Sequence, residues 1–242
     1  RIAEHRDLRL PVMVNFDGFI ISHTMEVVDL IDDADVKAFV GEYKPELHLL
    51  NPNEPILVGP VDLPDWLFEH KRANIEATSR APRAIREVMG EFGRLSGRSY
   101  DLIEAYRASD AEFVLVVLGS TAGTAKEAAD ELREKGVPAG VIKVRSFRPF
   151  PGREIWDAMP KAKVVGVLDR SIAFGLGGGP VFHEVRSFGY ELGARVPVVS
   201  YVYGIGGRDI NTDHIGKAFG DLKEIAATGR LGERYRCLNL RD

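Results

Sequence analysis

The second half of the sequence predicts an α/β fold built on a mainly parallel sheet. From about residue 109 onward, short apolar runs alternate with amphipathic stretches of helical length. The runs are continuously apolar instead of alternating with polar residues, which is typical of strands covered by helices on both faces. About four such units in succession fit a small doubly wound domain, whose ligands usually lie at the carboxyl ends of the strands.

Strands and helices are expected to follow one another in strict order. The predicted strands are 112–120, 138–147, 162–171 and 197–204, and the predicted helices are 121–136, 152–159, 181–193 and 211–229. Gly136 is suited to end the first helix, and Asn211 or Thr212 to cap the start of the last one. One face of that last helix carries its apolar residues, namely Ile215, Ala218, Phe219, Leu222 and Ile225.

The first half has a different pattern. Residues 1–9 look like the last turns of a helix, 10–14 like a strand, and 25–43 like a segment that is helical in part. Five prolines in 44–66 predict extended chain without long helices. Residues 80–100 predict a helix with Pro82 near its start and an apolar stripe made of Ile85, Val88, Met89, Phe92 and Leu95. We expect a domain boundary near Ala108, and, because the first residue is Arg1, a piece of a longer chain.

Composition excludes several classes of protein. The chain has 242 residues, 45% hydrophobic, with a net charge of −4, so it has no nucleic-acid-binding footprint. The longest aliphatic run, Phe113–Leu118, is far shorter than the ~20 residues of a membrane span. The single cysteine, Cys237, excludes an internal disulfide framework and cannot hold an iron–sulfur cluster. It suits a reducing compartment, which predicts a cytoplasmic protein.

Two glycine-rich stretches fall short of phosphate-binding motifs. Residues 174–181 have Pro180 where the dinucleotide pattern needs a third glycine, and 204–209 have Asp209 there. These glycines either permit tight turns and close packing, or their amides hold an anion or a partner's backbone. No histidine or cysteine spacing indicates a metal site, and no nucleophilic serine motif is found.

Two polar clusters are candidate functional sites. Asp17, Ser22 and His23 follow the apolar run near the start, where they either stiffen a turn or contribute to a ligand site. Arg145 and Arg148 alternate with apolar residues as a strand enters a turn. They either pair with neighbouring carboxylates or form a basic lip at an interface or opposite an anionic substrate.

Six segments, in order, resemble the α subunit of pyruvate:ferredoxin oxidoreductases, within the thiamine-dependent 2-oxoacid:acceptor oxidoreductases. They are "PVMVNFDGFIISHTMEVVDLIDD", "LSGRSYDLIEAY", "VLGSTAGTAKEAADELREKG", "GVIKVRSFRPFP", "VVGVLDRS" and "YVYGIGGRDI". The resemblance implies that 1–26 are the end of a pyrimidine-binding α/β domain, truncated here. It further implies that 27–108 are a proline-rich linker with a connecting helix, and 109–242 a three-layer domain like the C-terminal domain of transketolase.

The resemblance also implies a reaction. A 2-oxoacid, with pyruvate expected, and coenzyme A are converted reversibly to acyl-CoA, carbon dioxide and two electrons for ferredoxin. The cofactors would be thiamine diphosphate with Mg²⁺ and iron–sulfur clusters, held mostly by other chains or by upstream residues and none by this chain alone. The partners would be β, γ and cluster-carrying subunits, with ferredoxin and coenzyme A reached through the complex, and neither nucleic acid nor membrane.

This chain is then expected to be catalytically incomplete and mainly structural. Asp17, Ser22 and His23 would lie near cofactor or substrate, and Arg145, Arg148, Gly177 and Gly178 at subunit interfaces. Two alternatives stay open from the residues themselves. The chain could be a stand-alone α/β interaction module, or a domain that binds a nucleotide or coenzyme A at its strand ends.

Overall fold

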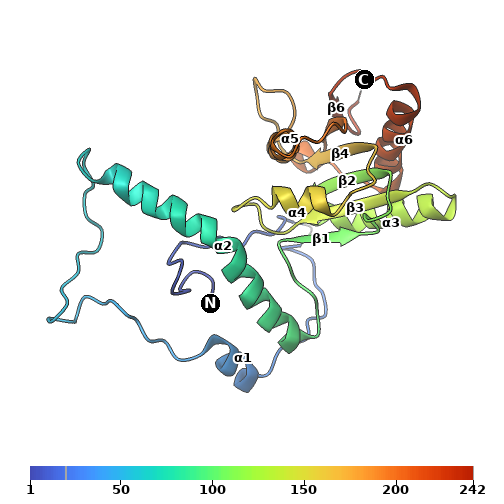
Figure 1. Cartoon of the computed structure of the whole chain (residues 1–242). Coiled ribbons are helices and arrows are strands. Elements are labelled where there is room, and N and C mark those ends of the chain that lie inside the picture. Colours follow the sequence, from blue (N-terminus) through green and yellow to red (C-terminus); the bar gives the residue numbers. More distant parts are fainter. Residues whose placement is uncertain (20, 242) are drawn as a thin grey trace. The chain divides into compact units, whose positions relative to one another are not determined.

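The computed structural model describes residues 1–19 and 21–241, which divide into two compact units. The N-terminal unit comprises Arg1–Val14 and Met25–Asp101, and the C-terminal unit comprises Asn15–Thr24 and Leu102–Asp242. The short segment 15–24 therefore packs with the C-terminal unit, although both of its flanks belong to the other one. All strands and most helices of the described residues lie in the C-terminal unit (Figure 1).

The C-terminal unit is built on one six-stranded sheet with the order β1-β3-β2-β4-β5-β6. Its strands are β1 (Ile103–Tyr106), β2 (Phe113–Leu118), β3 (Ala139–Val144), β4 (Val164–Asp169), β5 (Val198–Val202) and β6 (Tyr235–Cys237). Only β1 is antiparallel to its neighbour, β3, and every other pair is parallel. The predicted mainly parallel α/β fold is confirmed.

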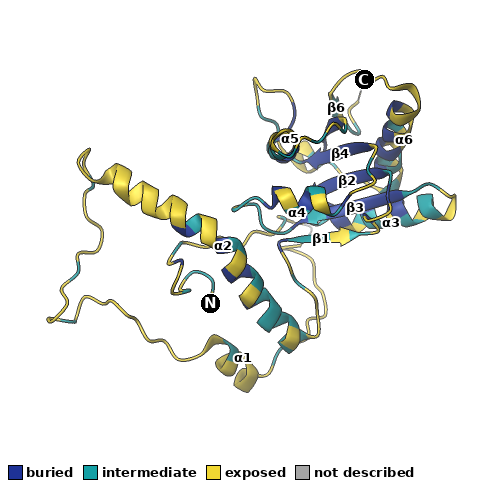
Figure 2. Ribbon diagram, in the orientation of Figure 1, coloured by how far each residue is buried: buried dark blue, intermediate teal, exposed yellow. Residues whose placement is uncertain are grey.

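Helices cover both faces of this sheet, which gives three layers. They are α3 (Thr121–Glu134), α4 (Gly152–Asp157), α5 (Pro180–Glu191) and α6 (Thr212–Thr228). Helices α3 and α6 pack on one face, in a core that includes Leu115, Phe219 and Leu222. Helices α4 and α5 pack on the other, with Val116 and Ile155. The inner strands β2, β3 and β4 are accordingly mainly dark blue in Figure 2, which explains why their sequences are continuously apolar.

The predictions for this unit hold element by element, with two omissions. All four predicted strands and four predicted helices form. Asn211 caps α6, accepting from the backbone N–H of His214, and the predicted apolar face of α6 is buried. The omitted strands β1 and β6 are short edge strands of mixed polarity. Each of them has a neighbouring strand on one side only. Edge strands of this kind need not be continuously apolar, which was the pattern that predicted the inner strands.

The N-terminal unit contains only two helices among its described residues, α1 (Asp33–Val40) and α2 (Leu67–Ser96). Residues 41–66 have neither helix nor strand, as their prolines predicted. The predicted helix at 1–9 is wrong, since these residues form turns, and so is the predicted strand at 10–14. Leu8 is buried without being helical, whereas Val12, Met13 and Val14 of the expected strand are 47%, 86% and 87% exposed.

Helix α2 is longer than predicted, because it begins at Leu67 and runs through Pro82. Residues 67–81 are rich in strong helix formers, and Arg72 and Glu76 form an i,i+4 ion pair there. The buried residues of α2 are Ala77, Ala81, Ala84, Ile85 and Val88. The packed face of the helix therefore begins at Ala77, before the predicted stripe, which starts at Ile85. Among the described residues, no helix is both long and apolar enough to span a membrane.

Candidate functional site

The carboxyl edge of the C-terminal sheet is where this fold would place a ligand. Strand β2 lies between β3 and β4, so the connection from β2 to β3 and the connection from β3 to β4 run in opposite directions across the sheet. In open parallel sheets, such a reversal opens a crevice beyond the strand ends. The residues that follow the strands here are Gly119 and Ser120 after β2, Arg170 after β4, and Tyr203 after β5.

Asp17, which was predicted as a site residue, lies at this carboxyl edge. Its Oδ2 accepts a hydrogen bond of 2.6 Å from the backbone N–H of Ser120, and its Oδ1 lies 3.7 Å from Nη1 of Arg170. The Asp17 side chain is only 21% exposed and that of Arg170 30%. The carboxylate therefore joins the end of β2 to the end of β4.

Gly119 leaves room for the carboxylate. Its backbone φ is +81°, which glycine tolerates better than other residues, and a Cβ there would lie 3.0 Å from Oδ2 of Asp17. Sequence reasoning missed Gly119, Ser120 and Arg170 as partners of Asp17. A usable signal was present, because all three lie at the C-terminal ends of the predicted strands 112–120 and 162–171, which were expected in one sheet.

The environment of Asp17 favours its ionised form. Burial opposes ionisation, but the hydrogen bonds from Ser120 and the positive charges of Arg170 and Lys143 outweigh it, so the pKa of Asp17 is lowered. Tyr203 nearby stays protonated, because burial and the neighbouring carboxylates raise its pKa to about 12. The guanidinium of Arg170 lies 5.9 Å from the centre of the Tyr203 ring.

Ser22 and His23 are in an exposed turn that follows Asp17. The Ser22 hydroxyl accepts from the backbone N–H of Phe19 at 3.0 Å and lies 2.7 Å from Nδ1 of His23. The His23 ring stacks on Phe19 at 4.7 Å between centroids. Because Ser22 engages Nδ1, Nε2 is the remaining polar atom of the imidazole.

The backbone of this turn is strained at Phe19, whose φ is +59°. A bulky residue in the left-handed region costs on the order of 1–3 kcal/mol, and such residues are concentrated at functional sites. The backbone N–H of His23 closes the turn on the carbonyl of Phe19 at 3.0 Å. Asp17, Ser22 and His23 thus share one segment, in which Asp17 makes the hydrogen bond and the ion pair to the sheet edge.

The glycine-rich loop before α5 encloses a carboxylate of its own. Asp169, at the end of β4 and only 4% exposed, accepts the backbone N–H groups of Val181 and Phe182, each at 3.0 Å. A Cβ on Gly179 would lie 2.2 Å from the Asp169 side chain, so this position needs glycine. Two amides of the first turn of α5 are therefore already bonded, which favours the close-packing interpretation over an anion-binding loop.

The tip of the same loop is exposed and apolar. Phe174 is 90% and Leu176 72% exposed, and Gly177 beside them is exposed, whereas Gly178 is buried. The loop is closed at its base by a hydrogen bond from the Ala173 N–H to the Gly178 carbonyl, at 2.9 Å. The base is thus ordered by hydrogen bonding while its tip faces solvent.

Arg145 and Arg148 both pair with carboxylates. Arg145 lies 2.6 Å from Glu104, which also pairs with Lys126, and Arg148 lies 2.5 Å from Glu184. Arg145 is largely buried in its ion pair, but the Arg148 side chain is 58% exposed. Arg148 therefore keeps surface on which a partner could dock, and its place at an interface stays a prediction.

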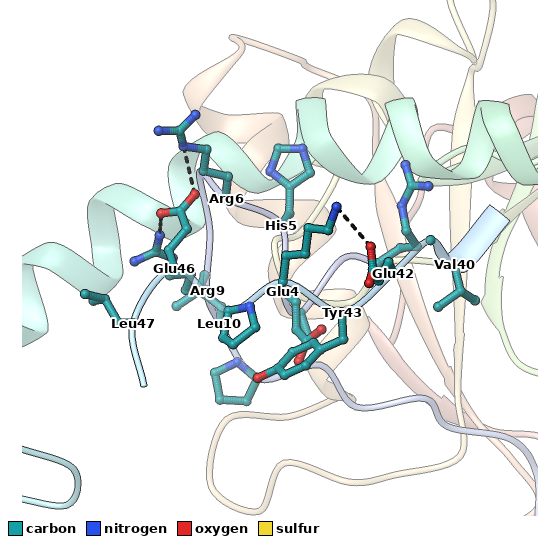
Figure 3. A pocket seen from close by; sticks show the side chains of 16 residues that line it. Glu4, His5, Arg6, Arg9, Leu10, Val40, Glu42, Tyr43, Glu46 and Leu47 are labelled. Atoms are coloured by element: carbon teal, nitrogen blue, oxygen red, sulfur yellow. Dashed lines mark hydrogen bonds and ion pairs between the residues drawn. The ribbon is translucent and has the colours of Figure 1, made fainter. Parts of the chain in front are cut away.

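The N-terminal unit has an open cavity of about 810 Å³, lined by residues from 1–11 and 40–47 (Figure 3). Several of its charged groups are paired with one another. Glu46 binds both Arg6 and Arg9, and Lys44 lies 2.9 Å from Glu42. None of the predicted site residues lines this cavity.

The described residues do not fit the metal-bearing groups that the resemblance implies. No group of three or more His, Cys, Asp or Glu side chains among them is placed to hold a metal ion. Cys237, the lone cysteine, is exposed beside the Tyr235 hydroxyl. We therefore derive no step of a reaction through the diphosphate-bound Mg²⁺ or an iron–sulfur cluster on this part of the chain.

Two family models match the chain. Residues 1–90 match "Pyruvate flavodoxin/ferredoxin oxidoreductase, thiamine diP-bdg", and residues 111–215 match "Pyruvate:ferredoxin oxidoreductase core domain II". The division into 1–26, 27–108 and 109–242 stays a prediction.

Curated relatives are similar along most or all of the chain. Pyruvate synthase subunit PorA of Thermotoga maritima is 48% identical over 100% of this chain and 61% of that protein. The subunit of the same name from Methanothermobacter thermautotrophicus is 41% identical over 89% of this chain and 55% of that protein. The chain thus spans a little over half the length of these relatives.

Among solved structures, a split-gene transketolase, described as an inactive β4 tetramer, is similar with a TM-score of 0.43. The two chains are 16% identical, and the match covers 55% of this chain and 44% of the transketolase chain. The family models and the curated relatives agree with each other and with the ordered motifs. The chain belongs to the family of pyruvate:ferredoxin oxidoreductase α subunits.

Proposed function

We propose that this chain is part of the α subunit of an enzyme that oxidatively decarboxylates a 2-oxoacid, with pyruvate as the expected substrate. A 2-oxoacid anion and coenzyme A would yield acyl-CoA, carbon dioxide, one proton and two electrons for ferredoxin. The observation that carries the proposal is 48% identity along the whole chain with a subunit named for pyruvate synthase.

The chemistry of this reaction would be shared among chains. Thiamine diphosphate supplies the carbon chemistry in such enzymes, and the protein supplies binding and electrostatics. Since the described residues present no metal-binding group, we assign the diphosphate, its Mg²⁺ and the iron–sulfur clusters to other chains or other residues of the subunit. The chain by itself is then expected to be inactive.

We propose that Ser22 and His23 lie near the cofactor or the substrate in the assembled enzyme. They are exposed polar groups in a strained turn, and the hydrogen bond between Ser22 and Nδ1 orients the imidazole. In the assembled enzyme, His23→Ala should lower kcat/KM for the 2-oxoacid by about tenfold or more, the range of a lost charged or polar contact in the transition state. His70→Ala, at another exposed histidine, is the matched control and should leave kcat/KM unchanged.

We also propose that exposed apolar surface meets other subunits. The tip at Phe174 and Leu176, the adjoining Gly177, and separately Arg148 would be contact points of the C-terminal unit. Buried Gly178 would contribute only by holding the loop. Aromatic and arginine side chains are enriched where interfaces derive their affinity, which fits a structural role for this unit.

The alternative of a nucleotide- or coenzyme-A-binding domain has less support. The crevice beyond β2 and β4 contains the Asp17 carboxylate, and two first-turn amides of α5 bind Asp169. A phosphate would have to displace one of these carboxylates. Calorimetry of the purified chain with coenzyme A and thiamine diphosphate tests this, and we expect no micromolar binding of either.

Co-purification from the native source tests the proposed function most broadly. The chain should be recovered with subunits that carry iron, and the preparation should show coenzyme-A-dependent oxidation of a 2-oxoacid. Recovery alone, without iron and without this activity, would favour the stand-alone interaction module. Comparing pyruvate with other 2-oxoacids would identify the substrate.

A further inference from the structure

We propose that the residues at the carboxyl ends of β2 and β4 form a carboxylate-binding site, occupied within the chain by Asp17. Its ligand class is a small monocarboxylate. This inference concerns residues of the C-terminal unit and does not depend on the proposed function. Asp17 is accordingly a positioning residue, which holds the segment 15–24 on the sheet edge.

Groups that follow two strands contact the Asp17 carboxylate, and a residue after a third strand lies against one of these groups. The start of α3, after β2, supplies the Ser120 N–H at 2.6 Å, and the residue after β4 supplies the Arg170 guanidinium at 3.7 Å. Tyr203, after β5, lies beneath that guanidinium. The site thus combines a directed donor with a positive charge, the two features by which proteins recognise carboxylates.

The backbone around the crevice is shaped for these groups. Gly119 has a φ of +81°, and a Cβ there would lie 3.0 Å and 3.2 Å from the two oxygens of Asp17. Gly204, after β5, would place a Cβ 2.8 Å from Nε of Arg170. Both the carboxylate and the guanidinium therefore lie against glycine backbone, where any larger residue would have to displace them.

The Asp17 carboxylate belongs to a segment of the chain that has no regular secondary structure. Residues 15–24 form neither helix nor strand where they are described, yet they pack with the C-terminal unit. A segment without a ladder of backbone hydrogen bonds needs other contacts to hold it. Among its described contacts with the sheet edge, Asp17 makes the hydrogen bond and the ion pair.

Removing the carboxylate and then adding it back tests the proposal. In Asp17→Ala of the full chain, the exchange rate of the Ser120 amide should rise by at least about tenfold, because the charged acceptor of its hydrogen bond is lost. Acetate at high millimolar concentration should restore protection of this amide, whereas chloride at equal ionic strength should not. Asp29→Ala, at an exposed carboxylate of the N-terminal unit, is the control and should leave the Ser120 amide unchanged.

Asp17→Asn provides the second variant, because it preserves the side-chain volume and is safer for folding. Its Ser120 amide should be less protected than in the parent, and acetate should not rescue it, since the amide side chain fills the site. In Asp17→Ala with Arg170→Gln, rescue by acetate should need a higher concentration. Unchanged exchange in both Asp17 variants, or rescue of Asp17→Ala by chloride as effective as by acetate, would overturn the proposal.

Discussion

The two units differ most in how far their large apolar side chains are exposed to solvent. In the C-terminal unit, Leu115, Val116 and Leu222 are 0% exposed, between a sheet and helices of the same unit. The N-terminal unit leaves many large apolar side chains 86% to 101% exposed, among them Met13, Val14, Met25, Val27 and Leu30. Figure 2 shows the contrast as dark blue strands and mostly yellow N-terminal segments. The C-terminal unit has a closed core, whereas the N-terminal unit has apolar surface that suits contact with further protein.

The largest expected effect comes from truncating one leucine in each unit. Leu115→Ala should cost about 2–5 kcal/mol of the free energy of unfolding, because it opens a cavity in a packed core. Leu30→Ala makes the same chemical change at a side chain that is 89% exposed, and should cost no more than about 0.5 kcal/mol. Urea denaturation of both variants checks this, and equal losses would remove the contrast between the units.

A pair of glycines gives effects of opposite sign. Gly179→Ala would place a methyl group 2.2 Å from the buried Asp169 side chain and should destabilise by about 1–3 kcal/mol. Gly90→Ala, within α2, meets only the end of Arg94, at 4.0 Å, and should stabilise by about 0.5–1 kcal/mol through helix propensity. Thermal unfolding of both measures it, and a stable Gly179→Ala would mean that the loop can move away from Asp169.

Replacing one glutamate in each unit compares the contribution of their ion pairs to stability. Glu104 lies between Lys126 and Arg145 with its side chain 29% exposed, and Glu104→Gln should cost about 1 kcal/mol. Glu76 pairs with Arg72 on α2 and is 56% exposed, so Glu76→Gln should cost at most about 0.5 kcal/mol. If both losses disappear equally in high salt, the Glu104 cluster is no better shielded than a surface pair.

The smallest expected effect is the pH dependence contributed by Asp17. Since its pKa is lowered in the folded state, its ionised carboxylate stabilises above the unfolded-state pKa, and this contribution is lost as the pH falls through the folded-state pKa. The stability difference between the parent and Asp17→Asn should therefore shrink as the pH is lowered from about 6 to about 3. A difference that stays constant over this range would show that the charge of Asp17 contributes nothing.

The same contrast explains what could be predicted from the sequence. The inner strands and α6 were predictable because burial on both faces, or on one helical stripe, imposes a strict pattern on residues such as Val116 and Leu222. The turns at residues 1–9 and the early start of α2 were missed. In the N-terminal unit, the position of an apolar residue in the sequence does not indicate whether its side chain is buried. Local patterns can mislead wherever an apolar face is not covered by the same unit.

The candidate site was predictable in part for a related reason. Asp17, Ser22 and His23 stand out as polar residues after an apolar run, but their partners do not. The bond from Ser120 to Asp17 spans 103 residues, and only the sheet topology brings those residues together. The strained backbone of Phe19 likewise follows from the turn and from no pattern in the sequence.

Hydrogen exchange in two states tests the central claim most directly. The chain is measured alone and in the assembly purified from its native source. We expect the amides of β2, β4 and α6 to be equally protected in both, and those of 25–66 to be unprotected alone and protected in the assembly. Amides of 25–66 that are already protected in the isolated chain, or that stay unprotected in the assembly, would contradict the account of a closed C-terminal unit and an N-terminal unit completed by other protein.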